Sequence, residues 1–115
     1  MASPEPAVPY FTPDDDDALP LPAGLVGEGD FFVLRVWDDS MIEAAICDGD
    51  FVVVRRQPTA ESGEIVAAVV DGETTVKVLD VAGGRLLSRS PHYPPIDSSG
   101  ITLLGRVVTV LRRLR

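Results

Sequence analysis

The sequence predicts a mostly-β fold, a single domain of short, curled and mainly antiparallel strands with little helix. Beyond residue 30 the chain consists largely of short apolar runs rich in valine, and β-branched residues favour strands. Glycine-containing pairs separate several of these runs, at Asp48-Gly49, Asp71-Gly72 and Gly83-Gly84, and such pairs suit tight hairpin turns. At 115 residues the chain can bury one core but not two.

The first 30 residues differ in composition from the rest of the chain. They include seven acidic residues, six prolines and no basic residue. Because proline has no N–H to donate, this composition disfavours both helix and strand pairing. We therefore predict an acidic, proline-rich flexible arm at residues 1–18 and one folded domain at residues 19–115. The aspartate run at 14–17 lacks the spacers and the glycine bend of a calcium loop, so we interpret it as a solvated charge run.

Six apolar runs are predicted strands, in chain order FFVLRV at 31–36, FVVVRR at 51–56, EIVAAVV at 64–70, TTVKVL at 74–79, RLLS at 85–88 and LLGRVVTVL at 103–111. Turn pairs precede the second and fifth runs, and Asp71-Gly72 joins the third run to the fourth. The only helical candidate is SMIEAAI at 40–46, where Ser40 and Glu43 have the spacing of a capping box.

Composition and charge exclude several classes of function. The net charge of -8 and the pI near 4.4 disfavour a general nucleic-acid binder, because binding to phosphates requires a basic surface. The single cysteine cannot form an internal disulfide and is compatible with a reducing cytoplasm. The sequence shows neither a long apolar run nor a basic region ahead of an apolar one, so we predict no membrane span and no signal peptide.

Three residues outside the predicted strands are candidate nucleophiles or bases. The spacing of Ser40 to Glu43 favours a helix cap, although a serine there could also be a nucleophile. His92, the only histidine, lies in the proline-flanked stretch SPHYPPI, and we interpret it as a surface or turn residue. Cys47 has no histidine or positive cluster near it in the sequence, so we interpret it as a buried structural thiol.

Lys77 is the second possible base for a serine, and it is the only lysine beside nine arginines. In a strand its side chain shares a face with Thr75 and Leu79. If that face is buried, desolvation lowers the pKa of the amine until it can accept a proton from a hydroxyl, which arginine cannot do. If the face is solvated, Lys77 is an ordinary surface lysine. The residues alone leave both alternatives open.

Five specific motifs, in this order along the chain, are similar to those of a known family. They are DSM at 39–41, DGD at 48–50, TVK at 75–77, PHYPPI at 91–96 and LLGRVVTVLRR at 103–113. Over about residues 19–115 the sequence resembles the C-terminal domain of LexA repressors, particularly the actinobacterial type. These belong to peptidase family S24, which also holds UmuD and phage repressors. The resemblance implies a fold of the LexA and signal-peptidase type.

The resemblance also implies a site and its partners. Ser40 matches the nucleophile and Lys77 the general base of a Ser/Lys dyad that cleaves an Ala-Gly bond within the repressor. Backbone N–H groups of Ser40 and Met41 would face the oxyanion, and no metal or organic cofactor is needed. The family context is cytoplasmic: the SOS response to DNA damage, stimulation by the RecA filament, and a homodimer formed through the C-terminal strand.

Three features depart from the family pattern. Asp38 stands where the family usually has glycine, and its charge could hold Lys77 protonated and lower activity. The expected self-cleavage position falls near Glu5-Pro6, where proline excludes ordinary cleavage, and Ala23-Gly24 is a poor substitute. We also find no DNA-binding domain in this sequence and expect no direct DNA binding from it.

Two other functions remain alternatives. A signal peptidase shares the Ser/Lys chemistry, but it normally needs a membrane anchor beside the site. A catalytically weak dimerisation module would pair with a full-length repressor or a UmuD-like partner. The apolar stretch at 107–111 suits such an interface and equally suits an ordinary core. We interpret the closing arginines, Arg112, Arg113 and Arg115, as a solvated strand end.

Overall fold

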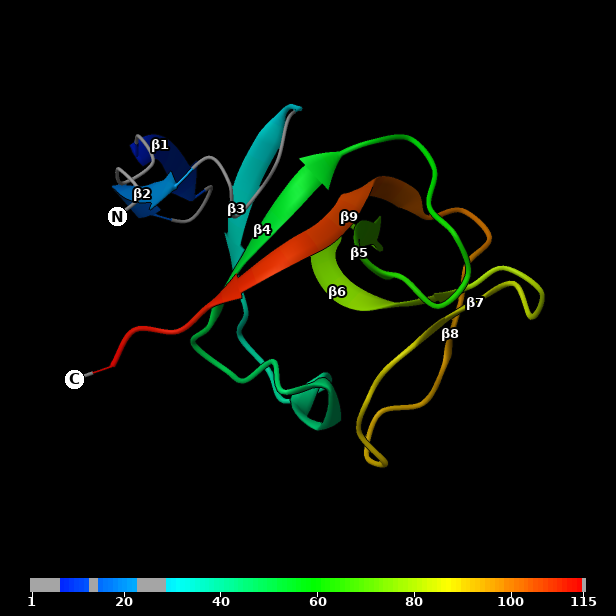
Figure 1. Ribbon diagram of the computed structural model, residues 1–115. Coiled ribbons are helices and arrows are strands. Elements are labelled where there is room, and N and C mark those ends of the chain that lie inside the picture. Colours follow the sequence, from blue (N-terminus) through cyan, green and yellow to red (C-terminus); the bar gives the residue numbers. More distant parts are fainter. Residues whose placement is uncertain (1–6, 13–14, 23–28, 115) are drawn as a thin grey trace, which may run out of the picture.

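The computed structural model describes residues 7–12, 15–22 and 29–114, and in this part of the chain the secondary structure is almost entirely β (Figure 1). The elements are β1 (Ala7–Thr12), β2 (Asp15–Pro22), β3 (Phe31–Arg35), the 3-10 helix η1 (Ile42–Ala44), β4 (Phe51–Arg56), β5 (Ile65–Val70), β6 (Glu73–Asp80), β7 (Arg85–Leu87), β8 (Ile96–Asp97) and β9 (Thr102–Leu111). The predicted fold class is confirmed.

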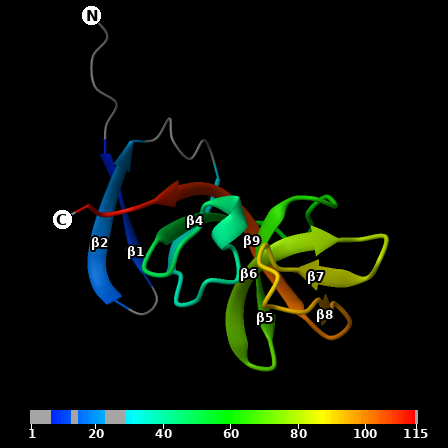
Figure 2. The same cartoon turned by 90° about the horizontal axis from the view of Figure 1, so that it is seen from below.

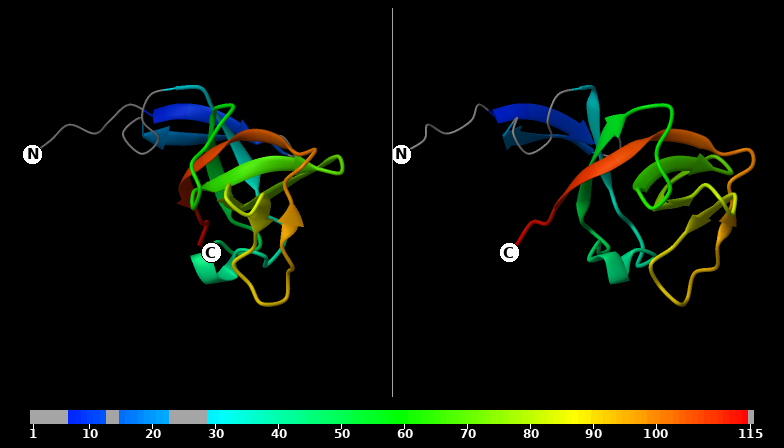
Figure 3. Two further views of the ribbon diagram at one scale, coloured as in Figure 1. Left: turned by 90° about the vertical axis from the view of Figure 1, so that its right-hand side faces the viewer. Right: turned by 45° about the vertical axis from the view of Figure 1, so that its right-hand side comes forward.

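Seven strands form one curled sheet in the order β3-β4-β9-β5-β6-β7-β8, and all of its described pairings are antiparallel. The sheet bends into a half-barrel, with β6 strongly curved (Figures 1 and 3). The register of β9 shifts once against β4 and once against β5. Such bulges increase local twist and bend a strand, so they help the sheet to curl.

The six predicted strands all exist, and their bounds differ from the predicted ones by at most one residue at either end. The hairpin from β5 to β6 turns at Asp71 and Gly72, which both have positive φ angles of 50° and 81°. A two-residue turn of this kind matches the twist of the strands it joins. β8 was not predicted, because its two residues follow a proline pair and leave almost no periodic pattern.

The N-terminal region departs from the prediction that its composition disfavours strand pairing. β1 and β2 form a separate antiparallel two-stranded sheet that lies beside β3 (Figure 3). Pro9 is opposite Pro20, and Pro22 lies two residues further on. Antiparallel ladders alternate between positions that exchange hydrogen bonds and positions that do not. Prolines spaced by two residues can therefore all occupy positions that need no N–H.

The predicted helix at 40–46 is only partly present, and its predicted cap is absent. The helical part is the three-residue η1, which ends at Ala45 in the left-handed region with φ 63°. Its N-cap is Met41, and no side chain caps it. The capping interpretation of Ser40 is therefore wrong. Its hydroxyl has other partners, as described below.

The largest buried apolar cluster among the described residues fixes the loop at 36–50. Met41 and Ile46 of this loop are fully buried and join a cluster with apolar residues of β3, β4, β5 and β6. Figure 2 views the molecule from the side on which η1 lies. No helix within the described residues is long and apolar enough to cross a membrane.

Candidate active site

Backbone hydrogen bonds close the loop at 36–50 at its base. The N–H of Val36 donates to the carbonyl of Asp50 at 2.8 Å, and the N–H of Gly49 donates to the carbonyl of Val36 at 2.7 Å. Further along, the Ser40 carbonyl accepts from the N–H of Arg89 at 2.7 Å. The loop that carries Ser40 is thus held both at its base and by the segment that follows β7.

The structure brings Ser40 and Lys77 together in the interior. Lys77 Nζ lies 2.8 Å from Ser40 Oγ, although 37 positions separate the two residues. Lys77 comes from the middle of β6, and its Nζ also lies 2.7 Å from Thr75 Oγ1 and 3.2 Å from the carbonyl oxygen of Val76. The exposed fractions are 1% for Ser40 and 4% for Lys77.

Burial sets the acid–base behaviour of Lys77. Desolvation disfavours the ammonium form and lowers the pKa of Lys77 from its ordinary value, while the nearby charge of Asp38 raises it by a smaller amount. The strand face that holds Lys77 and Thr75 is therefore inward, which is the first of the two alternatives left open by the sequence. The charge of Asp38 acts in the anticipated direction, but desolvation outweighs it.

Asp38 contacts Ser40 twice through a single oxygen atom. Its Oδ1 accepts from the Ser40 hydroxyl at 2.8 Å and from the Ser40 backbone N–H at 3.0 Å. The charge of Asp38 was expected to matter, but these two hydrogen bonds were not predicted. The spacing itself is a signal, because aspartate often accepts from the N–H two residues further on in an Asx turn.

A pocket of about 440 Å³ opens beside Ser40. Its apolar lining includes Phe32, Leu34, Val36, Met41, Val76 and Leu104. Polar and charged groups also line it, among them Asp38, Thr75 and Glu73. Ser40 therefore stands at the wall of a pocket with a mixed apolar and polar lining, while Lys77, which is buried, reaches its hydroxyl from β6.

The other candidate residues do not join this site. His92 is exposed in the turn after β7, as predicted. Cys47 is half-buried and not fully buried as expected, and its Sγ lies 3.1 Å from Arg112 Nη2. The possible cleavage positions near Glu5-Pro6 and at Ala23-Gly24 lie outside the described residues.

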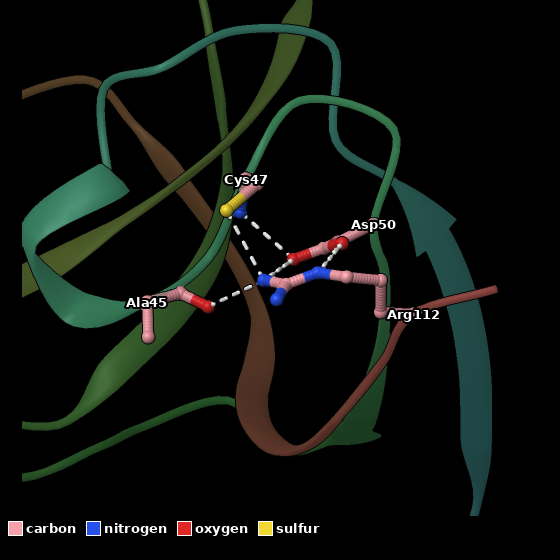
Figure 4. Close-up of polar contacts among 4 residues, drawn as sticks. All are labelled: Ala45, Cys47, Asp50 and Arg112. Carbon is pink, nitrogen blue, oxygen red and sulfur yellow. Dashed lines mark hydrogen bonds and ion pairs between the residues drawn. The ribbon is translucent and has the colours of Figure 1, made fainter. Parts of the chain in front are cut away.

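Arg112 lies just beyond the end of β9 and its side chain is 49% exposed, as the predicted solvated strand end requires, but it also makes contacts that the sequence did not suggest. Its Nε donates to Asp50 Oδ1 at 2.8 Å, and its Nη2 donates to Asp50 Oδ2 at 2.9 Å and to the carbonyl of Ala45 at 3.1 Å (Figure 4). Asp50 is 2% exposed. The guanidinium holds the pKa of this carboxyl below its usual range. Arg112 thereby ties the end of β9 to the loop that carries Ser40.

Comparison with known proteins assigns this arrangement to a family. A family model described as Peptidase S24-like matches residues 2–108. The chain belongs to the peptidase S24 family. It is 57% identical over 101 residues to LexA repressors from Nocardioides sp. and Acidothermus cellulolyticus, and 54% identical over 101 residues to the LexA repressor from Mycobacterium tuberculosis.

These matches cover 86% of this chain and 41%, 37% and 43% of the three relatives. The chain thus spans about two fifths of the length of the curated relatives it matches. The resemblance to the S24 domain of actinobacterial LexA repressors is confirmed.

Proposed function

We propose that this chain is a LexA-type serine peptidase domain that cleaves a peptide bond of the Ala-Gly kind, with Ser40 as nucleophile and Lys77 as general base. The observation that carries the proposal is the buried 2.8 Å contact between Lys77 Nζ and Ser40 Oγ beside the pocket. A lysine of lowered pKa within reach of a serine hydroxyl is the arrangement that Ser/Lys acyl transfer requires.

The reaction needs a neutral Lys77. Its amine accepts the proton of Ser40 as Oγ bonds to the carbonyl carbon, and backbone N–H groups of Ser40 and Met41 donate to the oxyanion. The Lys77 ammonium then gives its proton to the leaving amine, the C–N bond breaks, and an ester remains on Ser40. Water loses a proton to Lys77 and attacks the ester. Lys77 returns this proton to Ser40 Oγ as the acid leaves, which restores the serine hydroxyl and the neutral amine.

The relatives suggest the biological setting of this activity. They are LexA repressors, so we place the proposed cleavage in the cytoplasm, in the SOS response to DNA damage, with the RecA filament as the stimulating partner. The net charge of -8 is unfavourable for binding DNA phosphates. We therefore expect this region to act on protein and not to contact DNA directly.

A second candidate function, a catalytically weak dimerisation module, is favoured by the edge of β9. Residues 102–106 of β9 pair with β5, whereas residues 107–111 pair with β4 alone among the described strands. Val110 on this half is 40% exposed. An apolar strand segment whose described ladder runs along one side suits pairing with a second copy or with a related partner.

The test of peptidase function is cleavage of a synthetic peptide with the family's Ala-Gly sequence, followed by mass spectrometry from about pH 7 to 10, because a general base must be neutral to act. We expect cleavage to rise with pH and to vanish in both Ser40→Ala and Lys77→Ala. Arg113→Ala, which removes one exposed positive charge, serves as the matched control and should cleave like the parent chain.

Equal cleavage by Lys77→Ala and the parent chain would remove Lys77 from the mechanism. If no variant cleaves while the chain is folded and dimeric, the dimerisation module becomes the better account.

A further inference from the structure

The direction of the hydrogen bonds around Ser40 differs from the direction that catalysis needs. A serine hydroxyl has one hydrogen to donate, and a carboxylate oxygen can only accept. The 2.8 Å contact with Asp38 Oδ1 therefore uses the hydrogen of Ser40 Oγ. In the contact between Ser40 Oγ and Lys77 Nζ, the hydrogen must then come from the lysine.

This assignment holds for both protonation states of Lys77. The ammonium form has three hydrogens, which match its three neighbours Ser40 Oγ, Thr75 Oγ1 and the Val76 carbonyl. The neutral amine has two hydrogens and one lone pair, and the lone pair can face only the Thr75 hydroxyl. In neither state can Lys77 accept the Ser40 proton while Asp38 holds it.

The same oxygen also accepts a hydrogen bond from an N–H group that the transition state needs as a donor. Asp38 Oδ1 accepts from the Ser40 N–H at 3.0 Å, and this N–H is one of the two groups proposed to bind the oxyanion. A negatively charged acceptor bonds more strongly to an N–H than a neutral carbonyl does. The carboxylate thus competes with the substrate carbonyl for the group that should stabilise the reaction.

We propose that Asp38 is a positioning residue that holds Ser40 in a resting state, and that its carboxylate must leave before the serine can react. This inference rests on the proposed function. An Asx turn alone would use only the backbone N–H, whereas here the nucleophilic hydroxyl is bonded as well. Asp38 is exposed, so its side chain can rotate into water without opening the core. A substrate that displaces it would switch the site on.

The test measures covalent labelling of Ser40 by a fluorophosphonate probe with intact-mass spectrometry. The rate constant of inactivation and the affinity for the probe are determined separately. We expect Asp38→Ala to raise the rate constant at least about tenfold, because a freed oxyanion donor is typically worth 10² to 10³. Asp38→Asn keeps a weaker, neutral acceptor, so its rate constant should lie between those of the parent chain and Asp38→Ala. Asp39→Asn removes one negative charge at the neighbouring position, and Ser40 in this variant should be labelled at the parent rate.

The outcomes separate this inference from the proposed function. If Asp38 were only structural, its loss would slow labelling, so a rate equal to or below that of the parent chain overturns the resting-state role. Labelling that persists in Lys77→Ala overturns the base instead. No labelling in any variant, Asp38→Ala included, overturns both, since the released serine should then react. A faster rate in Asp38→Ala that is lost in the double variant with Lys77→Ala supports both.

Discussion

At the scale of single residues, two opposing effects act on Lys77. Burial favours the neutral amine and the charge of Asp38 favours the ammonium form, with burial the larger effect. The three hydrogen bonds made by Nζ show how a buried cation can be tolerated, since each of its hydrogens has an acceptor. Lys77 is thus stable in a buried position, and its ammonium group loses a proton more readily than that of a surface lysine.

The lowered pKa of Lys77 makes stability depend on alkaline pH. Between that pKa and the ordinary value of 10.5, the unfolded chain binds a proton that the folded chain does not, so stability rises with pH across this window. Below this window Lys77 is protonated in both the folded and the unfolded chain, and burial of its charge destabilises the fold to the full extent. We expect Lys77→Met to be more stable than the parent chain at neutral pH, by about 1–4 kcal/mol. Urea unfolding from pH 7 to 10.5 should show the difference shrinking, and a constant difference would contradict it.

The ion pair of Asp50 and Arg112 makes stability depend on pH in the acidic range as well. Because the folded pKa of Asp50 is below 3.8, its stabilisation is present above about pH 5 and is lost as pH falls through the lowered pKa. Arg112→Ala should unfold about 5–10 °C lower at pH 7 and lose less stability on acidification. Thermal unfolding at pH 7, 5 and 3 measures this. Arg113→Ala, which removes an adjacent exposed arginine, should behave like the parent chain.

At the scale of elements, the close approach of β9 to β4 depends on Gly105. A Cβ at this position would overlap the carbonyl oxygen of Arg55, which is backbone and cannot move aside as a side chain can. Gly105 pairs with Arg56 and with Ala67, so it lies where β9 changes from β4 to β5 as its main partner. A small residue here lets the sheet curl.

Gly105→Ala should therefore destabilise the fold by about 1–3 kcal/mol, the usual effect of overpacking. Chemical unfolding measures the change. Thr102→Ala, at an exposed position of the same strand, is the control and should differ little. An unchanged stability in Gly105→Ala would mean that β4 and β9 separate freely, against the continuous ladder between them.

Local patterns predicted these elements well, because turn pairs and valine runs act over a few residues. Asp71-Gly72 alone determines one hairpin, and its positive φ angles follow from residue type. Long-range contacts had no such signal. Arg112 meets Asp50 across 62 positions, and no nearby residue indicated this partner for the arginine. For Ser40 and Lys77, the single lysine and the family motifs predicted the pair, but not that Asp38 takes the hydroxyl proton.

At the scale of the whole molecule, the C-terminal half of β9 pairs with β4 and extends beyond the part of the strand that pairs with β5. Val108 and Leu111 pack against the cluster of Val33, Phe51 and Val53, so they are core and not free surface. Val110 is turned outward. The stretch at 107–111 therefore contributes to packing at Val108 and Leu111 and leaves Val110 accessible for the proposed interface.

If a homodimer forms through this strand, a two-fold axis places each substitution in the interface twice. Val110→Glu should then bring two carboxylates close together and weaken dimerisation at least about tenfold, since like charges across an interface are strongly unfavourable. The fold should be unaffected, because Val110 is 40% exposed in the single chain. Sedimentation equilibrium measures the dimer, and circular dichroism checks the fold. Val81→Glu is the control, since Val81 is an exposed valine outside β9. Equal dimerisation of both variants and the parent chain would place the interface elsewhere.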